Sequence, residues 1–295
     1  MIQEKLRGVG VALITPFNNY EIDYDALSRM IERVIEGGVD YIVALGSTAE
    51  TATLSQTERQ AVLRFVVERA AGRVPIVAGM GSNDTRALCT QLRSYDLSGT
   101  SAILSVVPYY NKPSQEGIYR HYMAVAEASP VPVIIYNVPG RTGVNMSAET
   151  TLRLAHDSKN IVAVKEASGD IEQMQRILDG RPDDFLVLSG DDGITIELVK
   201  RGGDGVISVA ANAFPKKFCR CIHDALDGDI ATAERAMESF AEPLHLLFCE
   251  GNPTGVKCMT AVMGVTQDEP RLPLVAGSEA LHNEMKKVVR KYELE

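Results

Sequence analysis

Short apolar segments alternate with amphipathic segments along most of the chain. Each short segment is almost entirely apolar and rich in β-branched residues, which is typical of a parallel strand covered on both faces. We predict eight strands, at residues 9–14, 41–45, 75–78, 102–106, 133–136, 161–165, 185–188 and 205–209. A polar turn follows each of them.

The segments between the strands predict amphipathic helices. Apolar residues recur at helical spacing after the first two strands, at Leu27, Met30, Ile31 and Val34 and then at Ala61, Val62, Phe65 and Val66. Eight strand–helix alternations favour a closed (β/α)8 TIM barrel over an open doubly wound sheet, which commonly has about five or six strands. The sequence therefore predicts an α/β barrel.

After the eighth strand, the helical pattern continues without another strand. Leu281, Met285 and Val288 illustrate it near the C-terminus. We therefore predict a catalytic barrel over residues 1–225 and a C-terminal helical appendage over residues 226–295. With 45% hydrophobic and 23% charged residues, the chain can bury one large core.

Composition limits the location and the partners of the protein. No segment has the roughly 20 consecutive apolar residues that span a bilayer, and residues 1–10 lack the charged and then apolar layout of a signal peptide. The sequence therefore predicts a cytoplasmic protein that does not bind a membrane. A net charge of −9 also argues against nucleic acid as a partner, because that would require a clustered basic surface.

The cysteines and histidines predict neither disulfides nor a metal site. The five cysteines are odd in number and scattered, so we expect reduced packing residues. Neither they nor the five histidines have the spacing of a zinc site. We predict no metal and no other cofactor.

In a (β/α)8 barrel the active site lies at the C-terminal ends of the strands. Lys165 ends the sixth predicted strand after an apolar run. A free lysine has a pKa of about 10.4, which leaves about one molecule in a few thousand unprotonated at neutral pH, and burial shifts the balance towards the neutral nucleophile. Such an amine can attack a ketone. The alternative is a lysine whose stem packs on the barrel and whose head pairs with Glu166 or water.

Tyr136 ends the neighbouring predicted strand, which places it beside Lys165. A phenol next to an imine-forming lysine can move the protons that carbinolamine formation and dehydration require. The alternative is a tyrosine at the rim of the sheet with a buried ring and a solvated hydroxyl, which is the commoner situation.

Three further residues near the strand ends are candidates for binding an anion. Ser47 and Thr48 follow the second strand and offer hydroxyl and backbone N–H groups. Arg141 follows Tyr136 and offers a planar guanidinium suited to a carboxylate. Without further context, these residues are more often turn residues and a surface arginine.

Two apparent ligand-binding motifs are better explained as helix starts. Gly79-Met80-Gly81 lacks the third glycine of a dinucleotide loop, and the polar residues that follow, up to Asp84, are typical of a helix cap. Gly190-Asp191-Asp192-Gly193 lacks the flanking ligands of a calcium loop and predicts a helix that begins at aspartate.

Taken together, these residues resemble the dihydrodipicolinate synthase family, whose members are 4-hydroxy-tetrahydrodipicolinate synthases within the pyruvate-dependent class I aldolase superfamily. The resemblance covers essentially the whole chain and is carried by Thr15-Pro16-Phe17, Gly46-Ser47-Thr48-Ala49-Glu50, Pro108-Tyr109-Tyr110-Asn111-Lys112-Pro113, Tyr136-Asn137-Val138-Pro139-Gly140-Arg141-Thr142, Lys165-Glu166-Ala167-Ser168-Gly169-Asp170 and Ser189-Gly190-Asp191-Asp192.

The resemblance implies a lyase of lysine and diaminopimelate biosynthesis. In this family the lysine at position 165 forms an imine with pyruvate, and the resulting enamine attacks L-aspartate 4-semialdehyde. Transimination then closes the ring of 4-hydroxy-tetrahydrodipicolinate.

The resemblance also assigns roles to single residues and implies a homo-oligomer. Tyr136 is the expected proton donor and acceptor, and Ser47 and Tyr110 are expected to link it to solvent, with Tyr110 supplied by the neighbouring subunit. The expected substrate contacts are Thr48 and Ile207 with pyruvate, Gly190 beside it, and Arg141 with the carboxylate of the semialdehyde. The implied assembly is a tight dimer or a dimer of dimers.

Two positions depart from the family pattern. Ser47 stands where these synthases usually have threonine, and Ala49 where they usually have glycine, so Ala49 would be strained if its turn required a positive φ. A Gly-Ser-Thr start is also common in N-acetylneuraminate lyases, but those lack the arginine at position 141. We therefore expect the synthase. The alternatives are another pyruvate-dependent lyase or aldolase, or an inactive barrel that binds a small acid.

Feedback inhibition by lysine, common in this family, is predicted to be weak or absent. Asn83 and Tyr109 match the inhibitor site of the family. Gln56, Arg59 and Ala87 replace its usual polar and acidic contacts. A cation at Arg59 would repel lysine, and Ala87 lacks a carboxylate that would attract its ammonium group.

Overall fold

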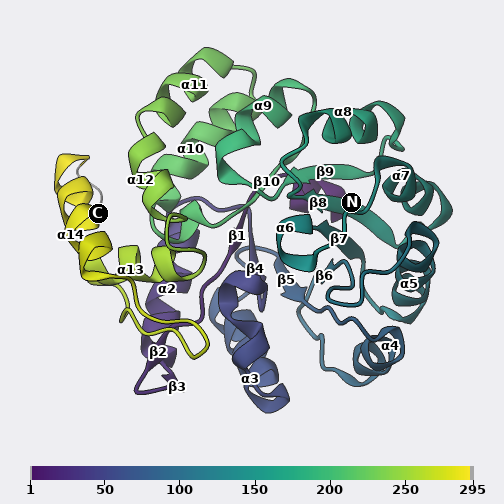
Figure 1. Cartoon of the computed structure of the whole chain (residues 1–295), viewed down its shortest axis with the longest axis horizontal. Helices are drawn as coiled ribbons and strands as arrows, with labels where there is room; N and C mark the ends of the chain where they lie inside the picture. The colour runs from purple at the N-terminus through teal and green to yellow at the C-terminus, as the bar shows by residue number, and fades with distance from the viewer. Residues whose placement is uncertain (1, 293–295) are drawn as a thin grey trace.

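Eight parallel strands close into a barrel (Figure 1), in the order β1-β10-β9-β8-β7-β6-β5-β4. The computed structural model describes residues 2–292. The barrel strands are β1 (Gly8–Ala12), β4 (Tyr41–Ala44), β5 (Ile76–Gly79), β6 (Ala102–Val106), β7 (Val133–Asn137), β8 (Ile161–Glu166), β9 (Leu186–Ser189) and β10 (Gly205–Ser208). All eight predicted strands are confirmed, with small shifts at their ends.

Helices surround the barrel as an outer ring (Figure 1). They are α2 (Tyr24–Glu36), α3 (Gln56–Ala70), α4 (Thr85–Ser94), α5 (Gln115–Ala128), α7 (Ala148–Asp157), α8 (Ile171–Gly180), α9 (Thr195–Lys200) and α10 (Pro215–Leu226). Short helices α1 (Ile2–Leu6) and α6 (Pro139–Thr142) precede β1 and follow β7. A two-stranded antiparallel sheet of β2 (Phe17–Asn18) and β3 (Glu21–Ile22) was not predicted. Its strands are too short to leave a periodic pattern.

The apolar side chains form two cores, one inside the barrel and one between the strands and the helices. Tyr41, Val43, Ile134 and Leu188 belong to the inner core, whereas the buried faces of α2 and α5 belong to the outer one. Gly10 is required inside the barrel, because a Cβ atom there would lie 2.1 Å from the ring of Tyr41. The strands are therefore buried on both faces, which explains why they read as continuous apolar runs.

The C-terminal region is helical, as predicted. It contains α11 (Ile230–Glu238), α12 (Ala241–Leu246), α13 (Thr254–Val262) and α14 (Glu279–Lys291). Leu281, Met285 and Val288 of α14 are buried in the outer core. The predicted boundary after residue 225 lies at the end of α10. That it separates two domains remains a prediction. In residues 2–292, no helix is both long enough and apolar enough to span a membrane.

Both segments interpreted as helix starts are confirmed as such. The side chain of Asp84 accepts a hydrogen bond from the backbone N–H of Ala87 and caps α4. Asp191 accepts from the N–H of Gly193 and caps the 3-10 helix η3 (Asp192–Ile194). Both aspartates satisfy backbone donors that the first turn of a helix leaves free.

Candidate active site

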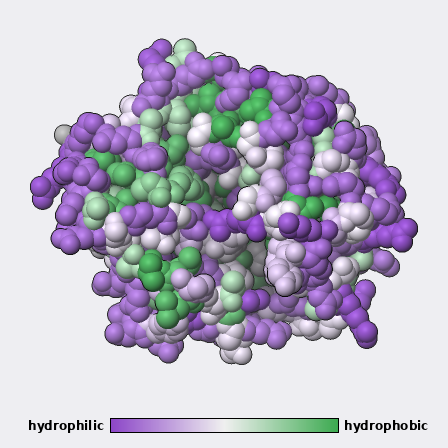
Figure 2. Space-filling model, in the orientation of Figure 1, coloured by the Kyte–Doolittle hydropathy of each residue, from purple (hydrophilic) through white to green (hydrophobic). Residues whose placement is uncertain are grey.

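A cavity of about 1150 Å³ opens at the C-terminal ends of the barrel strands. The space-filling view shows the surface hollowed over the barrel, with both hydrophilic and hydrophobic residues around the hollow (Figure 2). Its lining includes Ser47, Thr48, Tyr136, Arg141, Lys165 and Gly190. The structure therefore brings six of the eight predicted site residues together around one space.

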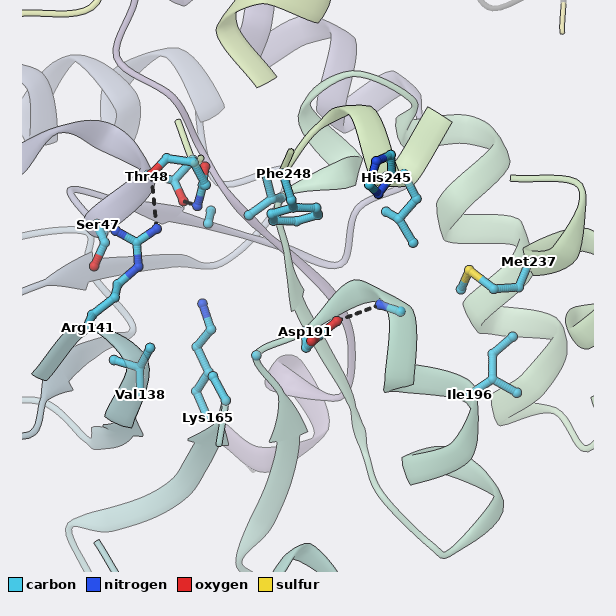
Figure 3. A pocket seen from close by; sticks show the side chains of 18 of the residues that line it. Ser47, Thr48, Val138, Arg141, Lys165, Asp191, Ile196, Met237, His245 and Phe248 are labelled. Atoms are coloured by element: carbon cyan, nitrogen blue, oxygen red, sulfur yellow. Dashed lines mark hydrogen bonds between the residues drawn. The ribbon is translucent and has the colours of Figure 1, made fainter. Parts of the chain in front are cut away.

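Lys165 is buried at the end of β8, with 5% of its surface exposed. Its amine points into the cavity between Arg141 and Asp191 (Figure 3). Burial lowers the pKa of Lys165 from 10.5 to about 8, while the charge of Asp192 acts in the opposite direction and Arg141 assists the lowering. At neutral pH roughly one molecule in ten then carries a neutral amine. The fraction of lysine in the neutral, nucleophilic form is therefore much larger than for a free lysine.

The alternative in which Lys165 pairs with Glu166 does not describe this structure. Glu166 is the last residue of β8 and is fully buried. Its carboxylate accepts hydrogen bonds from the side chains of Asn137 and Gln173 and from the backbone N–H of Ser168. These bonds hold the ends of β7 and β8 together and leave the neighbouring lysine free to face the cavity.

Tyr136 lies directly beside Lys165, since the two residues are paired in register on β7 and β8. The Nζ atom of Lys165 is 4.5 Å from the centroid of the Tyr136 ring. Burial raises the pKa of Tyr136 to about 12, against the opposing charge of Arg141. The phenol is therefore protonated at neutral pH and can donate a proton to a group bound at Lys165.

Ser47 and Thr48 lie in the 3-10 helix η1 (Ser47–Ala49), in the turn after β4. Thr48 is buried, and its Oγ1 accepts a hydrogen bond of 3.0 Å from Nδ2 of Asn252. Ala49 does not have a positive φ, so the backbone strain considered for an alanine at this position is absent. The positive φ values of this turn fall on Leu45, at 60°, and on Glu50, at 55°. The carboxylate of Glu50 is held by the buried amine of Lys257.

Arg141 lies in α6, immediately after β7, and is exposed at the mouth of the cavity. Its Nη2 donates a hydrogen bond of 3.0 Å to the backbone carbonyl of Asn252 (Figure 3). That single bond holds the guanidinium over the cavity and leaves its other N–H groups available. An anion that enters the cavity would meet this cation first.

Gly190 fits against the stem of Lys165. A Cβ atom at position 190 would lie 3.1 Å from Cε of Lys165 and 2.5 Å from Cβ of Ala167. The backbone N–H of Gly190 donates to the carbonyl of Glu166 at 2.7 Å. A larger residue at position 190 would therefore clash with Ala167 and press against the stem of Lys165.

Two predicted site residues do not line this cavity. Ile207 is fully buried in the inner core of the barrel, below the strand ends. Tyr110 is 88% exposed and has a positive φ of 75°. An exposed aromatic residue on a constrained turn is available to a neighbouring molecule, but within one chain it is not part of the site.

The far wall of the cavity was not predicted from the sequence. His245 and Phe248 lie opposite Lys165, in and after α12 (Figure 3), and Asn252 also lines the cavity. Asn252 joins two strand ends, because its side chain donates to Thr48 and its carbonyl accepts from Arg141. Asn252 is far from both partners in the sequence, and a single asparagine in a loop does not predict hydrogen bonds to such distant residues.

One group of side chains outside the cavity has the composition of a metal site. Cys258, Asp268 and His282 each place one ligand atom within 4.8 Å of the others. The Nε2 atom of His282 lies 2.8 Å from Oδ2 of Asp268, which also accepts from the N–H of Gly277. Burial raises the pKa of the Cys258 thiol to about 12. These hydrogen bonds account for the group as a link between α14 and the loop before it.

Comparisons with known proteins place the chain in one family. The model of the dihydrodipicolinate synthetase family matches residues 5–292. The chain is 55% identical over 276 residues to the 4-hydroxy-tetrahydrodipicolinate synthase of Phocaeicola vulgatus, with 93% of each chain covered. It is 50% identical over 291 residues to that of Parabacteroides distasonis, with 98% of each covered.

Solved structures match over the whole barrel. The chloride-inhibited dihydrodipicolinate synthase of Acinetobacter baumannii, complexed with pyruvate, superposes with a TM-score of 0.95 at 38% identity. The match covers 98% of this chain and 100% of that one. The similarity therefore includes the C-terminal helices as well as the barrel.

Proposed function

The chain belongs to the dihydrodipicolinate synthetase family, and its activity is that of a 4-hydroxy-tetrahydrodipicolinate synthase, a lyase of lysine biosynthesis; we propose that Lys165 carries this activity by forming a Schiff base with pyruvate. The observation that supports the assignment best is the buried amine of Lys165, 4.5 Å from the ring centroid of Tyr136 at the mouth of the barrel.

The reaction begins when the neutral amine of Lys165 attacks the keto carbon of pyruvate. The carbinolamine loses the ketone oxygen as water and becomes an iminium ion, which loses a proton from its methyl carbon to give an enamine. The enamine carbon then bonds to the aldehyde carbon of L-aspartate 4-semialdehyde. Finally, the amino group of the second substrate displaces Lys165 from the imine carbon, which closes the ring and frees the enzyme.

Tyr136 is the proposed proton donor and acceptor for these steps. Its phenol stays protonated at neutral pH, because burial raises its pKa to about 12, so it can protonate the departing hydroxyl of the carbinolamine. It can recover that proton from the substrate in a later step. Ser47, and Tyr110 from a second subunit, are the proposed links between this phenol and solvent.

The carboxylates of the two substrates are proposed to bind at separate places. Thr48 and the turn around it would hold the carboxylate of pyruvate, with Gly190 beside it and Ile207 beneath. Arg141 would bind the carboxylate of the semialdehyde, because its guanidinium lies at the open side of the cavity and has free N–H donors. This arrangement presents the aldehyde to the enamine carbon.

We propose a homo-oligomer, either a dimer or a dimer of dimers, as the working form. The support is Tyr110, which is 88% exposed, although the proton path proposed above requires its hydroxyl. A second copy of the chain would complete the site by supplying this side chain and would cover its apolar ring.

Reductive trapping tests the Schiff base directly. Incubation with pyruvate and borohydride should add one reduced pyruvate to the protein, and peptide mapping should place it on Lys165. Label on another residue would overturn the assignment, and an unchanged mass would favour an inactive barrel. Product assays with L-aspartate 4-semialdehyde and with N-acetylneuraminate then separate the synthase from a related lyase.

A further inference from the structure

A buried carboxylate near Lys165 has no part in the mechanism above. Asp192 begins η3, directly after β9, and is only 2% exposed. Its Oδ2 accepts hydrogen bonds from the backbone N–H groups of Val209 at 3.0 Å and Ala210 at 2.9 Å, just after β10. Its Oδ1 is buried and has no hydrogen-bond partner among residues 2–292. A buried carboxylate oxygen in this state is unfavourable unless positive charge lies near it.

The chain path brings Asp192 close to the lysine. Strands β8 and β9 pair in register, with Lys165 opposite Leu188 and Glu166 opposite Ser189. The next residue, Gly190, packs against the lysine stem, since a Cβ atom there would lie 3.1 Å from Cε of Lys165. Asp192 follows two residues later and is anchored to the end of β10. Its carboxylate is thus fixed by backbone donors, and its charge acts on Lys165.

The other polar and charged groups around Lys165 either carry a charge of the opposite sign to Asp192 or are bonded away from the amine. Arg141, from α6, is positive and lowers the pKa of Lys165, whereas the carboxylate of Asp192 raises it. Tyr136, from β7, presents its ring to the amine. Glu166 is bonded to Asn137 on the other side of the strand. Burial raises the pKa of Asp192 to about 6, and the charge of the solvent-exposed Asp191 adds to this effect.

We propose that Asp192 is the counter-ion of the Schiff base on Lys165; this inference rests on the Schiff-base mechanism proposed above. As the lysine nitrogen bonds to the keto carbon and water leaves, the nitrogen becomes a positively charged iminium in a site with little access to solvent. The fixed carboxylate stabilises that charge through space without having to reorganise. Asp192 is a positioning residue, because it acts through Lys165.

The substitution Asp192→Asn tests this role, since it removes the charge but keeps an oxygen acceptor for Val209 and Ala210. Two effects are expected. The pKa of Lys165 falls further, so the pH at which trapping with pyruvate and borohydride reaches half its maximal rate moves lower. At pH values above the pKa of Lys165, where the reacting amine is neutral, the iminium alone loses its counter-ion, so half-maximal trapping there needs about tenfold more pyruvate, equivalent to about one pKa unit.

Two further variants separate electrostatics from distortion. Asp191→Asn removes the same charge one residue away but in solvent, and should shift the pH profile much less. Ser208→Ala removes a hydroxyl that lowers the pKa of Asp192, and should move both measurements in the same direction as Asp192→Asn, by less. If circular dichroism shows that Asp192→Asn does not fold, the Ser208→Ala variant provides the test of the counter-ion role.

The outcomes distinguish the counter-ion from the mechanism on which it rests. If wild-type protein is not labelled at Lys165, the proposed mechanism itself fails. If wild type is labelled but Asp192→Asn keeps the wild-type pH midpoint and pyruvate dependence, the counter-ion assignment alone is overturned. A midpoint that moves to higher pH also overturns it, because that result would mean that water had entered a distorted site.

Discussion

The Nζ atom of Lys165 lies 4.5 Å from the centroid of the Tyr136 ring, and the two residues face each other in register on adjacent strands. Burial moves their pKa values in opposite directions, to about 8 for the amine and about 12 for the phenol. Between these values the neutral amine and the protonated phenol coexist. A nucleophile and a proton donor are thereby available together at mildly alkaline pH.

We expect Lys165→Met to stabilise the fold while abolishing trapping by pyruvate. The folded pKa of Lys165 lies below its usual 10.5, so the folded state is destabilised by the buried charge at pH values below about 8. This penalty fades as the pH rises towards 10.5. The gain in the free energy of unfolding should be a few kcal/mol at pH 7, because one pKa unit corresponds to about 1.4 kcal/mol.

Urea unfolding at pH 7 and at pH 9.5 measures this gain, which should be smaller at the higher pH. Lys286→Met, on the exposed face of α14, is the matched control and should change stability little at either pH. An equal gain at both pH values would show that burial of the charged amine is not its cause.

Tyr136→Phe should lower kcat by about 10²- to 10⁴-fold, the usual contribution of a positioned proton donor. Trapping at Lys165 should persist but become slower, because the amine remains in place. Tyr119→Phe removes a hydroxyl bonded to Asp157 outside the cavity and should leave kcat near wild type. A Tyr136→Phe enzyme with wild-type kcat would remove the phenol from the mechanism.

Arg141→Met should raise KM for L-aspartate 4-semialdehyde by about 10- to 100-fold, since a charge-assisted hydrogen bond to a carboxylate contributes about 1.5–3 kcal/mol. Pyruvate should still be trapped at Lys165. Steady-state kinetics with each substrate varied in turn provides the measurement. The control is Arg120→Met, which breaks an exposed pair with Glu116. A rise only in KM for pyruvate would show that Arg141 binds the carboxylate of pyruvate and not that of the semialdehyde.

Inhibition by lysine should be weak or absent, with no effect at micromolar concentrations. Arg59 lines a second cavity of about 420 Å³ that adjoins the first, and Tyr109 lies on its wall. Ala87 is exposed and provides no carboxylate. The double variant Arg59→Ala, Ala87→Glu should strengthen inhibition in a steady-state assay. Micromolar inhibition of the wild type would refute the prediction.

Mixing two inactive variants should restore activity if Tyr110 acts in a neighbouring subunit. Lys165→Ala lacks the nucleophile, and Tyr110→Phe lacks the relay hydroxyl and should be impaired. After the subunits are exchanged, some sites combine an intact Lys165 with an intact Tyr110 and regain wild-type turnover. Light scattering should report a dimer or larger assembly. A monomer with full activity would exclude this role for Tyr110.

The sequence by itself determined the architecture and the central pair. Eight apolar runs separated by amphipathic segments leave few alternatives to a closed barrel, because a strand covered on both faces must be apolar throughout. Lys165 and Tyr136 were found in the same way. Each ends a strand, and the ends of adjacent parallel strands meet at one edge.

The tertiary structure decided the contacts that depend on residues distant in the chain or on backbone angles. Sequence pattern did not separate Asp191, which caps a helix, from Asp192, which is buried and whose charge acts on Lys165. Nor did it reveal that Glu50, rather than Ala49, adopts the positive φ. Only the packed structure shows that Asn252 forms hydrogen bonds with both Thr48 and Arg141. Periodicity reports which face of an element is buried, whereas the partner of a polar side chain is fixed only when distant segments pack together.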